Sequence, residues 1–120
     1  MNPTREIDHE SWGEYFDALS RELLHAPVSI EVAQPAGPLT LEAQRVALHA
    51  LAYDRRDDVF EVAVSRGGPR LPSVLRHMVD HPRRVAVDSQ TMLAPITLSV
   101  DAGDGGRTVI HIEREAEITS

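Results

Sequence analysis

The residues best suited to binding chemistry gather in one stretch of the chain, between positions 66 and 84. This stretch holds five arginines and two histidines against one aspartate, a net charge of +4. The remaining residues carry −11, because the whole chain has a net charge of −7 with histidine neutral. Guanidinium groups bind carboxylates and phosphates in a fixed, often bidentate geometry. We therefore predict a surface for an acidic protein partner, with a small anion as the alternative ligand; the candidate residues are Arg70, Arg76, His77, Arg83 and Arg84.

The same arginines also have a simpler interpretation as ordinary surface side chains. In the folded protein their charge would then be balanced by the acidic N-terminal helix and the C-terminal tail. Replacing arginines that bind a partner would abolish binding and leave the melting temperature unchanged. Replacing arginines that hold the fold together would lower the stability as well.

The histidines offer a second kind of chemistry, because imidazole binds metals and transfers protons near neutral pH. His77 and His81 stand four residues apart, which on a helix would place both rings on one face. The glutamate of the H-E-x-x-H motif is missing, so a third ligand would have to come from Asp80 or His111. The alternative to a protein-interaction module is thus a small-molecule or metal-binding domain, enzymatic or not, that uses His49, His77 or His81 in a pocket. The sequence contains no cofactor motif, and we predict neither a metal nor a cofactor.

The composition excludes several classes of protein. The absence of cysteine rules out disulfide scaffolds, thiolate zinc sites and thiol catalysis. A net charge of −7 disfavours binding to nucleic acid, because phosphates repel an acidic domain. No stretch has the roughly 20 apolar residues of a membrane helix, and residues 1–11 do not resemble a signal peptide. We expect a cytoplasmic protein that binds neither nucleic acid nor membrane.

An amphipathic helix is expected at residues 9–25. Trp12, Phe16, Leu19 and Leu23 recur at helical spacing and form one apolar stripe. Asp8 is a suitable N-cap, and Ile7 can act as a hydrophobic staple. Pro27 should end the helix near His25, because the residue before a proline avoids the helical region.

The rest of the chain, residues 28–113, is expected to be rich in β-strands. Apolar residues alternate with polar ones in 28–33, 58–64, 96–101 and 108–113, and Val85 and Val87 mark a short strand. Residues 40–52 favour a strand paired with 58–64, although their composition also suits a helix. Residues 73–81 fit either a helical turn or a strand. Pro and Gly mark loops at 34–38, 65–72 and 103–106, and 88–95 is a connection.

Together these elements indicate an α+β fold. The chain has the length of a single domain, and we assign residues 1–120 to one domain with a polar tail at 114–120. Short turns between strands favour antiparallel neighbours. We therefore expect one N-terminal helix packed on a mostly antiparallel, possibly barrel-like sheet of about six strands.

The N-terminal pattern resembles a bacterial family of small proteins of unknown function. The residues that carry this resemblance are Arg5-Glu6-Ile7, Trp12, Phe16 and Ser20. The similarity extends over about residues 4–113, including His77, Pro82 and Val85 in the pattern His-x-x-x-x-Pro-x-x-Val and a final hairpin with glycines in its turn. The chain has Leu-Leu-His-Ala-Pro where the family has a glycine near the end of the helix. The resemblance implies one compact bacterial domain and supplies no catalytic residue.

The leading hypothesis is therefore a non-enzymatic accessory or protein-interaction module. The chain has no convergent polar motif of the kind that catalysis requires. A homodimer is a further expectation, in which exposed strand edges pair across a twofold axis. Trp12 and Tyr15 lie close together on the predicted helix, and one could belong to the core and the other to an interface.

Overall fold

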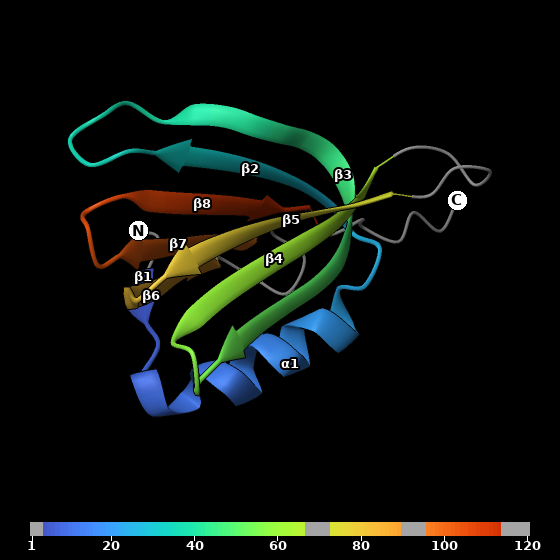
Figure 1. Ribbon diagram of the computed structural model, residues 1–120. Coiled ribbons are helices and arrows are strands. Elements are labelled where there is room, and N and C mark those ends of the chain that lie inside the picture. The colour runs from blue at the N-terminus through green and yellow to red at the C-terminus, as the bar shows by residue number, and fades with distance from the viewer. Residues whose placement is uncertain (1–3, 67–72, 90–95, 114–120) are drawn as a thin grey trace, which may run out of the picture.

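The protein folds into one antiparallel sheet with a helix packed on it (Figure 1). The computed structural model describes residues 4–66, 73–89 and 96–113. Within these residues eight strands lie in the order β1-β6-β7-β8-β2-β3-β4-β5, and each neighbouring pair is antiparallel. The elements are β1 (Thr4–Glu6), the 3-10 helix η1 (His9–Ser11), α1 (Trp12–Glu22), β2 (Pro27–Ala33), β3 (Thr40–Asp54), β4 (Val59–Arg66), β5 (Ser73–Asp80), β6 (Pro82–Ser89), β7 (Ile96–Ala102) and β8 (Arg107–Ile112).

The predicted α+β class and the antiparallel sheet are confirmed, but the strand count and the barrel-like closure are wrong. The sheet has eight strands instead of six, and β1 and β5 at its two ends do not pair with each other within the described residues. One extra strand is β1, whose three exposed residues carry no apolar alternation and become a strand by pairing with β6. The other is β5, the segment for which the sequence favoured neither helix nor strand.

The helix carries the predicted apolar stripe, with Trp12, Phe16, Leu19 and Leu23 all buried. Its predicted extent of 9–25 is too long, since α1 ends at Glu22. The chain turns away there because the backbone next bonds to β3: the amide of His25 donates to the carbonyl of Leu48 at 2.8 Å. His25 takes a φ of 71°, which is incompatible with continuing the helix. Within the described ranges, the chain has no helix with the length and hydrophobicity of a membrane span.

Residues 40–52 belong to a strand, as the hairpin argument favoured, and β3 lies centrally between β2 and β4. Strand β3 is irregular in its pairing with β2 and, at one place, in its pairing with β4. The register shifts between Leu48 and Ala50, so that His49 is the extra residue of a β-bulge. As a result Leu48 and Leu51 are both buried, although a regular strand would turn them to opposite faces.

A side chain of the helix forms hydrogen bonds with the β3 backbone just after this bulge. The Ser20 hydroxyl donates to the carbonyl oxygen of Leu51 at 2.7 Å and accepts from the Leu51 amide at 2.7 Å. At the start of the helix, the Trp12 indole Nε1 donates to the carbonyl of Ile7 at 2.9 Å. Trp12 and Ser20 of the N-terminal pattern thus tie the helix to the chain at both ends.

Strands β5 and β6 meet at a sharp corner formed by His81 alone. Pro82 begins β6, which runs to Ser89 and is longer than the strand predicted around Val85 and Val87. Gly103, in the β7–β8 turn, packs against this corner. A Cβ atom at Gly103 would lie only 3.0 Å from the carbonyl oxygen of His81, so the close approach requires glycine.

The remaining strand predictions agree with β2, β4, β7 and β8 within one or two residues. The predicted loop at 65–72 is shorter at its start, because Ser65 and Arg66 belong to β4. The predicted connection at 88–95 is likewise shortened by the last two residues of β6. Residues 67–72, 90–95 and 114–120 lie outside the described part of the chain.

The curved sheet and α1 enclose the core between them. His77 on β5 reaches Thr108 on β8, with 3.0 Å between Nε2 and Oγ1, although three strands separate β5 from β8 in the sheet order. Phe16 packs on Phe60 with 4.8 Å between the ring centroids. The largest fully buried side chains are Trp12, Phe16, Ile30, Leu48, Leu51, Phe60, Leu98, Ile110 and Ile112.

Replacing Ser20 by alanine should lower the free energy of unfolding by about 1–3 kcal/mol. The change leaves the amide and the carbonyl of Leu51 without their partner in a partly buried place. The measurement is urea denaturation followed by circular dichroism. Ser11→Ala is the matched control, since the Ser11 hydroxyl forms no capping bond at the start of α1. Equal stabilities of the two variants would contradict this role of Ser20.

Candidate functional site: an arginine-lined groove

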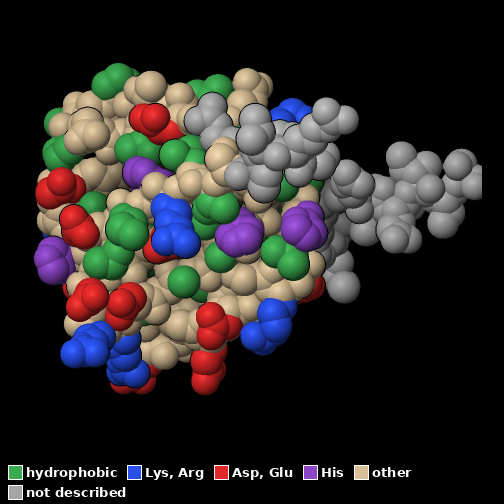
Figure 2. All heavy atoms as spheres, turned by 45° about the vertical axis from the view of Figure 1, so that its right-hand side comes forward, with side chains coloured by type: hydrophobic (Ala, Val, Ile, Leu, Met, Phe, Trp, Pro, Cys, Tyr) green, Lys and Arg blue, Asp and Glu red, His purple; other side chains and the backbone are tan. Residues whose placement is uncertain are grey.

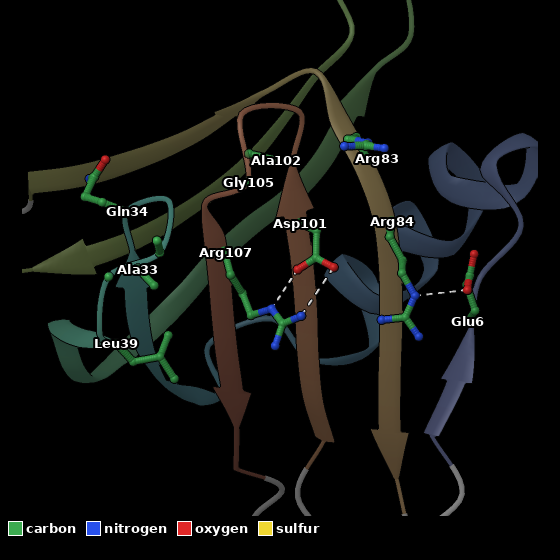
Figure 3. Close-up of a pocket in the computed structure, with 12 residues that line it drawn as sticks. Glu6, Ala33, Gln34, Leu39, Arg83, Arg84, Asp101, Ala102, Gly105 and Arg107 are labelled. Atoms are coloured by element: carbon green, nitrogen blue, oxygen red, sulfur yellow. Dashed lines mark hydrogen bonds and ion pairs between the residues drawn. The ribbon is translucent and has the colours of Figure 1, made fainter.

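An open groove of about 630 Å³ lies between the outer face of β6, β7 and β8 and the loop that joins β2 to β3 (Figure 3). Both positive and apolar side chains border it. Leu39, in the loop, is 47% exposed. The lining residues are Glu6, Ala33, Gln34, Ala36, Gly37, Leu39, Arg83, Arg84, Asp101, Ala102, Gly105 and Arg107.

Acidic and basic side chains alternate across four neighbouring strands of this face. Arg84 of β6 is the cross-strand partner of Asp101 of β7, which is in turn the partner of Arg107 of β8. The Arg107 Nε donates to Asp101 Oδ1 at 2.7 Å. At the sheet edge, the Arg84 Nε donates to Glu6 Oε1 at 3.0 Å (Figure 3).

A β-bulge adds Arg83 to this row. Pro82 pairs with Ala102 and Arg84 pairs with Asp101, so that Arg83 is the extra residue between them. Two consecutive arginines can therefore border the same groove, which a regular strand would not allow. Arg83 is exposed and has no ion-pair partner among the described residues.

The arginines of the groove keep unused hydrogen-bonding capacity. Arg84 contacts Glu6 through Nε alone, which leaves both terminal nitrogens without a described partner. The Asp101 carboxylate, by hydrogen bond and charge, raises the pKa of the Arg107 guanidinium above its already high value. The Arg84–Glu6 pair is exposed on both sides, and exposed pairs contribute only about 0–1 kcal/mol. A stronger anionic ligand can therefore displace or join these contacts.

The structure separates the residues that the sequence grouped together. Arg83 and Arg84 lie at the groove. Arg76, on β5, lies elsewhere, with its Nε 3.6 Å from Glu61 Oε2 on β4. His77 faces the inner side of β5 and bonds to Thr108, and its burial lowers its pKa. Arg70 lies outside the described residues.

The sequence prediction missed Arg107, Asp101, Glu6 and Leu39. Asp101 and Arg107 each lie three residues from Asp104, the centre of the observed turn, whereas the turn predicted at 103–106 would have paired Ala102 with Arg107. Glu6 could not be found in this way, because it reaches Arg84 only through the pairing of β1 with β6.

The histidines do not converge on one pocket. His77 borders a cavity of about 180 Å³ between β5 and the β7–β8 hairpin, and neither His49 nor His81 lines it. His49 is exposed at its bulge. In the described part of the chain, no group of three histidine, aspartate or glutamate residues is arranged to hold a metal ion. On the face shown in Figure 2, histidine, arginine and acidic side chains are interspersed among the described residues.

Of the candidate histidines, His81 instead joins a surface chain of hydrogen bonds at the β5–β6 corner. The Tyr53 hydroxyl donates to Asp58 Oδ1 at 2.7 Å, and His81 Nδ1 lies 3.2 Å from Asp58 Oδ2. His9 Nε2 lies 3.0 Å from the Tyr53 hydroxyl oxygen. Because Tyr53 donates its one proton to Asp58, His9 must be the donor in this bond.

Comparison with known proteins identifies the family. Residues 3–119 match the family of unknown function DUF5335, and the chain belongs to this family. An uncharacterized protein of Aquifex aeolicus (strain VF5) is 29% identical over 110 residues, which cover 92% of each chain. No solved structure matches the chain. The resemblance noted from the N-terminal pattern is thus confirmed.

The Tyr53 hydroxyl should ionise with a pKa of about 12, because burial and the hydrogen bond to Asp58 both disfavour the phenolate. Absorbance at 295 nm during alkaline titration measures this pKa in a Tyr15→Phe background, where Tyr53 is the remaining tyrosine. Asp58→Asn should lower the value toward 10.0, the ordinary pKa of tyrosine. A pKa near 10 with Asp58 intact would mean that the bond does not persist in solution.

Proposed function

We propose that this protein is a non-enzymatic interaction module that binds an acidic segment of a partner protein in the arginine-lined groove. The supporting observation is the free donor capacity of neighbouring arginines on a chain that is otherwise acidic. Arg83 has no ion-pair partner among the described residues, and Arg84 is bound through one nitrogen alone. An incoming carboxylate can bridge these groups with charge-assisted hydrogen bonds.

The shape of the groove favours a peptide segment over a single small anion. Its volume of about 630 Å³ far exceeds what one phosphate fills, and it is bordered by the exposed side chain of Leu39. Small-anion sites usually enclose the ion with several converging donors. Here Asp101 and Glu6 interrupt the row of arginines. We therefore favour a segment that carries several carboxylates and one apolar residue, which Leu39 would contact.

The chemistry of the groove gives no support to an enzymatic role. Its charged residues are three arginines and two carboxylates, of which Arg84 and Arg107 are held in ion pairs, and none of them is paired with a histidine. A nucleophile would need a general base within hydrogen-bond reach. Binding, with affinity set by charge and modified by salt, is the function that this arrangement supports.

Isothermal titration calorimetry with a short peptide of alternating glutamate and leucine tests the proposal. Arg83→Ala/Arg84→Ala should weaken binding at least about tenfold, because each lost charge-assisted hydrogen bond contributes roughly 1.5–3 kcal/mol. The melting temperature should stay unchanged, since these are surface positions. A matching loss of stability would assign the two arginines a structural role instead.

The chain offers a matched control for this pair. Arg55 and Arg56 are also consecutive and exposed, but they lie in the β3–β4 turn and do not line the groove. Arg55→Ala/Arg56→Ala removes the same net charge and should leave the affinity within about twofold. A peptide with glutamine in place of glutamate should not bind. If inorganic phosphate binds as tightly as the acidic peptide, the groove is a small-anion site and the proposal fails.

A further inference from the structure

Strand β5 is an open edge of the sheet. Within residues 4–66, 73–89 and 96–113, it pairs with β4 and with no other strand. Beyond the end of the strand, the amide of His81 donates to the carbonyl of Asp58 at 2.8 Å. Asp58 and His81 continue the β4–β5 register, so they form a hydrogen-bonded pair. In an antiparallel ladder, hydrogen-bonded pairs alternate with pairs that are not hydrogen-bonded. The backbone groups of Val74, Arg76, Met78 and Asp80 therefore point away from β4.

This edge lacks several of the features that usually prevent pairing with another strand. Natural edges are protected by short strands, bulges, prolines or charged side chains, and the two charges of β5, Arg76 and Asp80, have opposite signs. β5 is eight residues long, contains no proline and pairs with β4 without a register shift. Val74 and Met78 are 46% and 55% exposed on its outer face. The edge is therefore fit to accept a further strand.

We propose that the open edge of β5 pairs with β5 of a second copy of this chain, antiparallel and about a twofold axis at Met78. Residues opposite each other in an antiparallel pair share one face of the sheet. An axis at Met78 places Arg76 opposite Asp80 of the partner subunit, and the symmetry repeats this pair. Met78 then packs against Met78 of the partner subunit.

Charge selects this register over its neighbours. An axis at Arg76 would place two arginines opposite each other, and an axis at His77 or Val79 would leave neither Arg76 nor Asp80 opposite a group of opposite charge. Asp80 is exposed and has no ion-pair partner among the described residues. Arg76 lies 3.6 Å from Glu61 and is 63% exposed, so it can turn toward a partner. The arginine of β5 that does not reach the groove thus gains a role at a separate surface.

Sedimentation velocity of the untagged full chain over a concentration series tests the pairing. The wild type should sediment as a dimer of the 13.3 kDa chain. Arg76→Asp and Asp80→Arg should each raise the dissociation constant at least tenfold, because each places like charges opposite each other. The double variant Arg76→Asp/Asp80→Arg restores opposite charges and should return to within about threefold of the wild type.

Two further variants keep the test decisive. Met78→Glu should also give a monomer, since it places two carboxylates together at the axis, and its exposed position should preserve the fold. Arg55→Asp makes the same charge change as Arg76→Asp in the β3–β4 turn and should leave the dimer intact. A wild type that stays monomeric throughout, a dimer unaffected by the single changes, or a double variant that fails to recover would each overturn the proposal.

Discussion

The burial of one helical stripe against the inner face of a curved sheet is the interaction on which the rest of the structure depends. A single eleven-residue helix cannot cover eight strands, so the sheet must bend until it encloses most of its own apolar surface. The bulge at His49 contributes to this bending, because a bulge kinks its strand and increases the local twist. The Ser20 hydroxyl then forms hydrogen bonds with the amide and the carbonyl of Leu51, just after the bulge. These two bonds fix the helix over the sheet.

The same constraint determines what the outer face can be. With its one helix on the inside, the sheet leaves much of the outer face of β6, β7, β8 and β2 exposed. Many of the alternate positions there are polar, although Ala86 and Val109 are apolar and buried. Glu31 Oε1 lies 2.7 Å from His111 Nε2, and Asp101 holds Arg107. Such exposed pairs stabilise the fold little. Their effect is to hold the guanidinium groups in fixed places along the groove, which lowers the cost of ordering them when an acidic ligand binds.

The sequence predicts those parts of the fold in which local pattern and tertiary contacts agree. The stripe of Trp12 and Phe16 and the alternation in β2, β7 and β8 fall in this class. The failures arise where contacts distant in sequence decide the outcome. Strand β1 has no apolar pattern and forms because β6 pairs with it. The helix end is set by the bond from His25 to Leu48, and not by Pro27. At the candidate site, the charge pattern located Arg83 and Arg84. It could not show that the corner at His81 leaves Arg76 on another strand, or that Glu6 reaches Arg84.

The proposed binding site requires that Arg83, Arg84 and Arg107 receive the acidic ligand together. Nuclear magnetic resonance of the ¹⁵N-labelled protein observes each arginine Nε–H group directly during titration with the acidic peptide. We expect the signals of these three arginines to shift together with the backbone amides of the loop that contains Leu39, while those of Arg55 and Arg56 do not move. Shifts of similar size at arginines all over the surface would show that the attraction is a general effect of charge, and would contradict the assignment of the groove as the binding site.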